Sequence, residues 1–146
     1  KPIGAENNAG ITVDVSGFTL ASGGMFASLR DTAKIGQLIL NKGKVGETQV
    51  IPENWINDMF NQPGDNSLMR LGNESINPYY RSFIWGIGDG EGTLLASGVH
   101  GQFIYISPKT GVVITIFSTW PNADGGAPGV GLDSAMEIIE AIKNSI

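Results

Sequence analysis

The residues best suited to chemistry form the stretch Ser97-Gly98-Val99-His100-Gly101-Gln102. Runs rich in Ile, Leu, Phe and Tyr stand on both sides of it, and such runs are typical of β-strands. The stretch is therefore predicted to join the end of one strand to the start of the next. Because glycine has no Cβ, Gly98 allows a ligand to approach the backbone of its strand closely. The pattern predicts one edge of a binding cleft.

His100 is the only histidine of the chain. A histidine changes its charge near neutral pH, so it is suited to orienting a cleft, binding a substrate or modulating neighbouring acid–base groups. The competing interpretation is structural, with the ring hydrogen-bonded to a neighbouring loop. The sequence leaves both interpretations open.

Two other groups of polar residues have side chains that could act in catalysis, but each lies in a predicted turn. Lys109-Thr110-Gly111 directly follows Pro108 between two strand-like runs, which predicts a hairpin turn. Asp89 and Glu91 lie in a glycine-rich stretch, which is typical of a solvated turn and not of an acid–base pair. We therefore expect neither group to take part in catalysis.

The aromatic residues Tyr79, Tyr80 and Phe83 follow a long stretch without clear periodicity. Aromatic side chains commonly form the walls of small-molecule pockets, but packing in a core or loop is the favoured interpretation for each of them taken singly. Tyr80 is retained as a candidate substrate contact.

The hydrophobic pattern outlines the elements that must position these residues. Ser28, with Asp31 three residues later, is typical of a helix N-cap, and Pro52 is typical of a first helical position. Apolar alternation over 11–15 predicts a short half-buried strand or extended segment, and 62–82 is predicted to be a long loop. The predicted helices are 29–42, 52–61 and 132–146, and the predicted strands are 83–87, 93–97, 102–107 and 112–119.

This order of elements predicts an α+β fold. We expect an antiparallel sheet of about four or five strands, with a C-terminal helix packed on it and two helices preceding it. Residues 1–146 are expected to form a single segment, with a mostly helical part (1–61), the loop, and a final part of sheet and helix (83–146). A chain of this length is typical of one domain.

Composition and charge exclude several classes of function. Nine basic against fourteen acidic residues give a net charge of -5, and no cluster of Lys and Arg is present, so neither nucleic acid nor a membrane surface is an expected partner. No apolar run is long enough to span a bilayer. With no cysteine and one histidine, no metal site and no cofactor are expected. The chain is expected to be soluble, and its compartment, periplasmic or cytoplasmic, stays open.

Several motifs resemble those of a known enzyme family. Ala96-Ser97-Gly98, together with Gly23-Gly24-Met25 before the first predicted helix, resembles the penicillin-recognising serine hydrolases of the class C β-lactamase type. The G-x-H-G-Q pattern of 98–102 is similar to that of the 6-aminohexanoate-dimer hydrolases and related esterases. The resemblance covers only the C-terminal half of that family. It implies part of a β-lactamase/transpeptidase-like fold.

In that family a serine of an S-x-x-K element attacks the carbonyl carbon, and a K-T-G strand borders the cleft. No S-x-x-K occurs in this sequence, and Ala96-Ser97-Gly98 corresponds to the K-T-G strand. The resemblance implies that Ser97, Gly98 and His100 contact substrate. It also implies that the backbone N–H of Val99 is one of two oxyanion-hole donors, a type of group whose loss costs about 100- to 1000-fold in rate.

Ala96 replaces a lysine that helps to hold the carboxylate of a β-lactam, so the resemblance implies an ester or amide substrate instead. The expected partners are such a small molecule and an upstream segment or second chain that carries the nucleophile. In the family, strands from both ends of the chain share one sheet, so an exposed strand edge and association into a homo-oligomer are expected. The alternative is a non-catalytic binding or assembly domain that retains the scaffold, because absence of the nucleophile fits both.

Overall fold

A computed structural model describes residues 2–20, 23–61, 77–125 and 130–146. Its centre is a five-stranded antiparallel sheet in which every strand pairs with the next strand along the chain. The strands are β5 (Tyr79–Arg81), β6 (Ile84–Gly86), β7 (Leu94–Gly98), β8 (Gln102–Ser107) and β9 (Val112–Ile116). The sheet is thus a simple meander, with β5 and β9 at its two edges.

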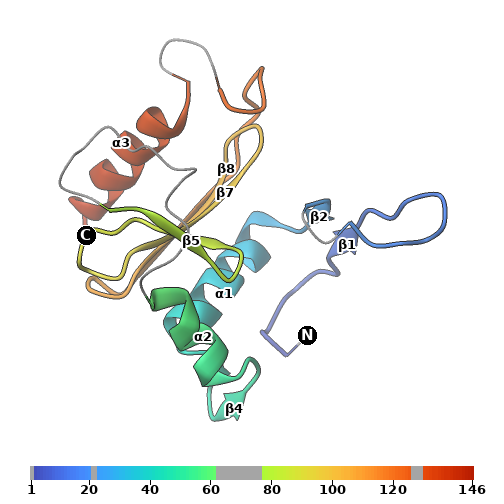
Figure 1. Cartoon of the computed structure of the whole chain (residues 1–146), viewed down its shortest axis with the longest axis horizontal. Coiled ribbons are helices and arrows are strands. Elements are labelled where there is room, and N and C mark those ends of the chain that lie inside the picture. Colours follow the sequence, from blue (N-terminus) through green and yellow to red (C-terminus); the bar gives the residue numbers. More distant parts are fainter. Residues whose placement is uncertain (1, 21–22, 62–76, 126–129) are drawn as a thin grey trace.

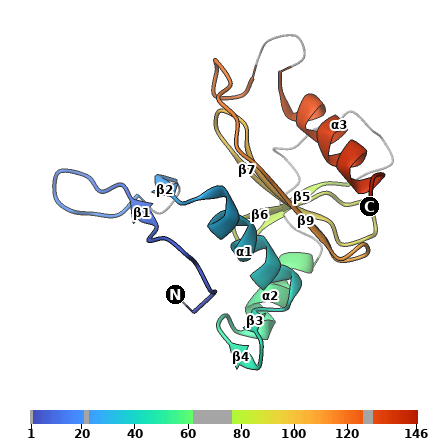
Figure 2. The ribbon, with the colours of Figure 1, turned by 180° about the vertical axis from the view of Figure 1, so that it is seen from behind.

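Helices cover both faces of this sheet (Figures 1 and 2). α1 (Leu29–Leu40) and α2 (Glu53–Phe60) lie on one face, and α3 (Leu132–Lys143) lies on the other. Side chains alternate between the two faces of a strand, so Leu94 packs with α1 and α2 whereas Leu95 packs with α3. Two hydrophobic cores therefore share one sheet.

α1 begins at the predicted residue and ends at Leu40, two residues before the predicted end. The Ser28 side chain accepts a hydrogen bond from the Asp31 N–H at 3.2 Å, which satisfies one of the free amides of the first turn. At the other end Gly43, with φ of 80°, donates its N–H to Leu38 O at 2.8 Å. Lys42, with φ of 54°, is already left-handed, and Gly43 adopts the same conformation without strain, so the chain turns away from the helix over these two residues. A small hairpin follows, formed by β3 (Lys44–Val45) and β4 (Thr48–Gln49).

The packing of α1 on the sheet depends on a glycine. A Cβ placed on Gly36 would lie 2.6 Å from a methyl carbon of Val113 and 2.9 Å from one of Ile104. Non-bonded carbon atoms do not approach one another this closely, so the absence of a side chain lets the helix backbone approach β8 and β9.

An arm precedes α1 and projects from the rest of the molecule (Figures 1 and 2). It comprises residues 10–20 and 23–26 and contains β1 (Gly10–Ile11), β2 (Met25–Phe26) and a bridge between Val13 and Thr19. Its large apolar side chains are exposed, and they are Ile11, Val13, Val15, Phe18, Leu20, Met25 and Phe26. The described part of the chain thus leaves this arm uncovered.

The predicted α+β fold, with an antiparallel sheet, a C-terminal helix and two preceding helices, is confirmed. The predicted loop 62–82 was wrong at its end, because Tyr79–Arg81 pairs with β6, while residues 62–76 lie outside the described part. The prediction that 11–15 is half-buried was also wrong, since Val15 is fully exposed. α2 begins one residue later than predicted, with Pro52 as its N-cap. No helix in the described ranges combines the length and apolar content needed to cross a membrane.

Replacing Gly36 by alanine tests the close packing of α1. Alanine favours a helix by about 1 kcal/mol over glycine, but overpacking a core costs about 1–3 kcal/mol. We expect Gly36→Ala to lower the free energy of unfolding, measured by urea denaturation. Gly23→Ala is the matched control, because its Cβ would meet no atom within 4 Å. A Gly36→Ala chain more stable than the parent would contradict the packing described here.

Candidate functional site

The turn between β7 and β8 carries the candidate residues Ser97 to Gln102, and backbone hydrogen bonds tie it to the segment after β9. His100 donates its N–H to Ala123 O at 2.9 Å, and Trp120 donates its N–H to His100 O at 3.2 Å. His100 and Gly101 both have positive φ, 60° and 83°. A histidine in this left-handed conformation needs support from its surroundings. The two backbone bonds supply it.

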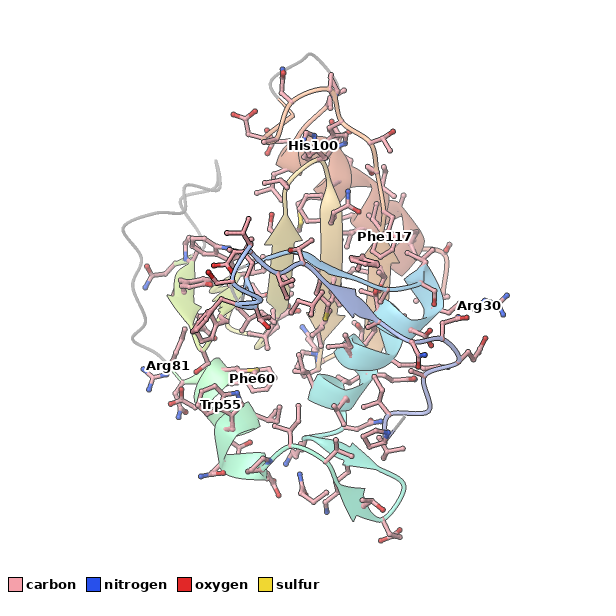
Figure 3. All side chains as sticks on the ribbon, turned by 90° about the vertical axis from the view of Figure 1, so that its right-hand side faces the viewer. Arg30, Trp55, Phe60, Arg81, His100 and Phe117 are labelled. Carbon is pink, nitrogen blue, oxygen red and sulfur yellow. The ribbon has the colours of Figure 1, made fainter. Side chains whose placement is uncertain are left out.

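The His100 ring adds a third connection to the same segment. Its Nδ1 lies 2.8 Å from Trp120 O. A carbonyl oxygen only accepts, so Nδ1 carries the hydrogen and Nε2 has the free lone pair in the neutral ring. In Figure 3 His100 lies near the top of the molecule, well above Trp55 and Phe60 of α2. The structure therefore gives this histidine the loop hydrogen bond of the structural interpretation and leaves its second nitrogen available to a ligand.

Gly101 allows the turn to lie flat against an indole ring. A Cβ at this position would be 2.5 Å from the Trp120 ring and 2.8 Å from Cβ of Ser118. The Trp120 ring also packs against Phe103, with 5.5 Å between ring centroids. The turn is thus fixed on one side by hydrogen bonds and by aromatic packing.

The opposite side of the turn is open. Ser97, Gly98, Val99 and His100 are all exposed, and 64% of Val99 is accessible. None of the hydrogen bonds between the turn and the segment after β9 uses the Val99 N–H. The Val99 N–H is thus not committed to that segment, and a backbone N–H is the type of donor that an oxyanion hole uses.

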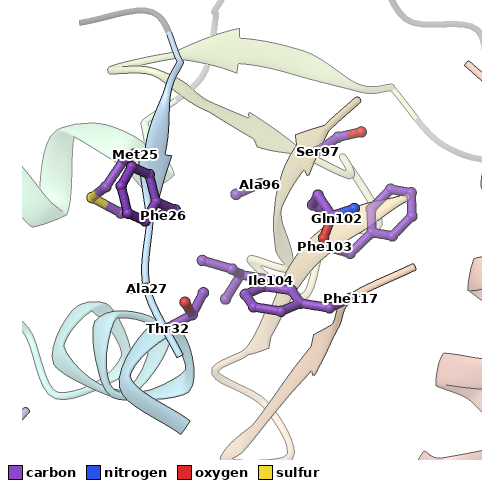
Figure 4. Close-up of a pocket in the computed structure, with 10 residues that line it drawn as sticks. All are labelled: Met25, Phe26, Ala27, Thr32, Ala96, Ser97, Gln102, Phe103, Ile104 and Phe117. Atoms are coloured by element: carbon purple, nitrogen blue, oxygen red, sulfur yellow. The ribbon is translucent and has the colours of Figure 1, made fainter. Parts of the chain in front are cut away.

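An apolar pocket of about 400 Å³ lies between this end of the sheet and the start of α1 (Figure 4). Its polar side chains are Thr32, Ser97 and Gln102, and none of its lining residues is charged. Apolar walls with few polar groups are typical of small-molecule sites. The lining residues are Met25, Phe26, Ala27, Thr32, Ala96, Ser97, Gln102, Phe103, Ile104 and Phe117.

Asp31 fixes the start of the chain to the wall of this pocket, beside Thr32. Its buried carboxylate accepts hydrogen bonds from Glu6 N–H at 2.8 Å, Asn7 N–H at 3.0 Å and Ser28 Oγ at 2.8 Å. The backbone hydrogen bond from Glu6 is the largest cause that holds the pKa of Asp31 well below its usual range. The Nζ of Lys34 lies 3.4 Å from the same carboxylate.

The structure does not bring Tyr80 together with the other candidates. Tyr80 lies in β5, its ring packs against Trp85 with 4.7 Å between centroids, and it does not line the pocket described above. Its neighbour Arg81 forms an ion pair with Asp58 of α2 at 2.5 Å, which ties this sheet edge to the helix. The hydrogen bond from Arg81 is the main reason that the pKa of Asp58 is lowered.

The polar groups set aside in the sequence lie in turns, as predicted. Lys109-Thr110-Gly111 connects β8 to β9, with the Gly111 N–H donating to Ser107 O at 2.9 Å. Asp89 accepts from the Glu91 N–H at 2.8 Å between β6 and β7. Nowhere in the described ranges do three or more His, Asp or Glu side chains gather as a metal site would require.

Sequence reasoning missed two parts of the site. The Gln102 amide and Trp120 hold the turn, but the sequence showed Gln102 only as part of a motif and gave no sign of this role for Trp120. The pocket wall formed by Met25 and Phe26 was also missed, because contacts between a loop and a distant sheet have no periodic signal. Two glycines around a histidine were the available sign of a tightly constrained turn.

Comparisons with known proteins identify relatives of this chain. It is 32% identical over 123 residues to the 6-aminohexanoate-dimer hydrolase of Paenarthrobacter ureafaciens, covering 82% of this chain and 31% of that protein. A solved structure from Bacillus anthracis, assigned as a 6-aminohexanoate-dimer hydrolase, matches with a TM-score of 0.74 and 28% identity, over 97% of this chain and 36% of that one. The chain spans about a third of the length of these relatives. No protein-family model matches the sequence.

Replacing Gly101 by alanine tests the contact between the turn and Trp120. Gly111→Ala is a matched control, because both glycines have positive φ and only Gly101 has a neighbour where the Cβ would stand. Each substitution is expected to cost about 1–2 kcal/mol for the left-handed backbone. Gly101→Ala should cost about 1–3 kcal/mol more and change Trp fluorescence. Equal losses of unfolding free energy in the two variants would contradict the contact.

Asp31→Asn tests the anchoring carboxylate through pH. A carboxyl group whose pKa is lowered by folding contributes stability above its unfolded pKa, and this contribution disappears as the pH falls through the folded pKa. We expect Asp31→Asn to lower Tm at pH 7, and the difference from the parent chain to shrink as the pH falls below the ordinary value of 3.8. The measurement is Tm of both chains from pH 7 to pH 2. A difference that stays constant over this range would contradict the prediction.

Proposed function

We propose that this chain, a relative of the 6-aminohexanoate-dimer hydrolases of the β-lactamase-like family, forms one wall of the active-site cleft of a serine hydrolase. The proposed substrate is a small molecule with an ester or amide bond. The similarity to proteins named as hydrolases, in both sequence and fold, supports this proposal. Since the chain spans about a third of those proteins, the complete activity belongs to a larger assembly.

The observation that carries the proposal is the exposed turn after β7. In this proposal Ser97 and Gly98 form the strand beside which the substrate lies, and the Val99 N–H donates to the oxyanion that develops on the substrate carbonyl. His100 lies next to this donor, with Nε2 available to the substrate. Tyr80 remains a proposed substrate contact from a more distant part of the sheet.

The nucleophile comes from a complementing segment in this proposal. A serine attacks the carbonyl carbon, the leaving group departs with a proton, and water then hydrolyses the acyl-enzyme. The exposed arm, the pocket beside it and the open edge of β9 offer apolar surface and backbone groups with which such a segment can pair. The segment belongs either to the same polypeptide or to a second chain.

The second candidate function is a non-catalytic binding or assembly domain. The observation that favours it is the arm, where exposed apolar side chains such as Val15 and Phe18 gather without cover from the described residues. In this case a second copy of the chain would occupy the arm and the β9 edge. Light scattering tests this self-assembly, because a monomer at high concentration speaks against it.

Complementation tests the catalytic proposal. The purified chain alone is expected to hydrolyse neither p-nitrophenyl esters nor nitrocefin above background, because the sequence contains no S-x-x-K nucleophile. Co-expression with the remaining N-terminal part of a 6-aminohexanoate-dimer hydrolase should yield ester hydrolysis and labelling of a serine by a fluorophosphonate. The N-terminal part alone is the control. A stable complex that neither labels nor hydrolyses esters would favour the assembly domain.

A further inference from the structure

One side chain connects the two backbone segments that define the candidate turn. The Gln102 Nε2 lies 3.1 Å from His100 O within the turn and 2.7 Å from Ser118 O in the segment after β9. Both partners only accept hydrogen bonds, so the amide nitrogen and not the amide oxygen must face them. An amide nitrogen has two hydrogens, and this arrangement uses both of them.

Gln102 also lies directly beside the strand end that precedes Val99. It is the first residue of β8 and the pairing partner of Gly98, the last residue of β7. The atoms nearest to a Cβ built on Gly98 are Cβ of Gln102 at 3.2 Å and Cγ of Gln102 at 3.6 Å. The stem of the glutamine therefore supports Gly98, and its amide supports the carbonyl of His100. Val99 lies between these two points.

We propose that Gln102 is a positioning residue that sets the orientation of the Val99 N–H toward the substrate. This inference rests on the proposed function, because the role of Val99 as an oxyanion donor is part of it. In this proposal Gln102 acts through the backbone of the turn and not on the reacting atoms. It acts by holding His100 O, the carbonyl oxygen at the far end of the Val99–His100 pair.

The chemistry of the two contacts explains why glutamine suits this position. Methionine has nearly the same length and no hydrogen to donate, so both carbonyl oxygens would lose a partner. Ionised glutamate would place a negative oxygen against two carbonyl oxygens, whereas protonated glutamate has one hydrogen to donate. The identity of this residue is therefore expected to control the turn through hydrogen-bond donation and not through volume.

The test is NMR of the ¹⁵N-labelled chain with Gln102→Met. The His100 and Trp120 amides, which hold the turn, are expected to exchange with solvent about tenfold faster or more, because two supporting hydrogen bonds are lost. The Val99 cross-peak is expected to shift. If His100 and Trp120 loosen while the Val99 cross-peak stays in place, Gln102 is only a structural residue and the proposal is overturned.

Gln49→Met is a matched control within the same chain. The Gln49 Nε2 also donates to two backbone carbonyls, Lys42 O at 2.8 Å and Ile51 O at 2.5 Å, in the β3–β4 hairpin. This variant should speed exchange of the Ile51 amide, which donates to Gly43 O, and leave the Val99 cross-peak unchanged. A Val99 shift of equal size in Gln49→Met would overturn the proposal, because it would show a general loosening of the fold.

A second variant keeps the proposal testable if Gln102→Met does not fold. In Gln102→Glu, protonation restores one donor, so lowering the pH should return the Val99 cross-peak toward its wild-type position. A Val99 cross-peak that shifts with pH in the same way in the Gln102→Glu chain and in the wild-type chain would overturn the proposal.

Hydrogen exchange of the Val99 amide in the wild-type chain tests the oxyanion role separately. A Val99 amide as protected as that of Trp120 would contradict the proposed function without deciding the role of Gln102.

Discussion

The approach of α1 to the sheet at Gly36 is the contact on which the pocket and the anchoring of residues 6 and 7 depend. Without a side chain at this residue the helix lies directly on Val113 and Ile104, so its first turn comes close to the end of β7. Thr32 thereby reaches the pocket, and Asp31 on the same turn fixes Glu6 and Asn7 beside it. A bulkier residue would push the helix away from the sheet and open the pocket on one side.

Periodic features of the sequence predicted most of the fold. The helix cap at Ser28 and the alternation in 102–107 depend on neighbours in sequence, and the structure has a helix and a strand there. The short strand Tyr79–Arg81 was missed because its order comes from contacts distant in sequence, among them the pairing with β6 and the ion pair to Asp58. The apolar alternation at 11–15 predicted a buried face, but a pattern carries no information on which surface would cover it.

In the candidate site, too, the sequence predicted local features but not the contacts between residues far apart along the chain. Glycines and the single histidine marked the turn, since their residue types report backbone strain and chemistry locally. The connection to Ser118 and Trp120 joins residues 16 and 20 positions apart along the chain, and no local pattern announces it. The turn thus combines a strained backbone, which a sequence suggests, with its support, which only the fold supplies. The similarity to 6-aminohexanoate-dimer hydrolases gives this supported turn a chemical context.

The meander order of the sheet also bears on how the chain reaches its folded state. Each of β5 to β9 pairs with the strand next to it in sequence, and the turn from β7 to β8 contains three residues. Contacts between sequence neighbours require little loop closure, and chains rich in them fold quickly. The hydrogen bonds from Glu6 and Asn7 to Asp31 span 25 and 24 residues, and they require a larger loop to close. The sheet, with the turn it carries, is accordingly the part of this chain able to form first and to serve as the template for the segments that join later.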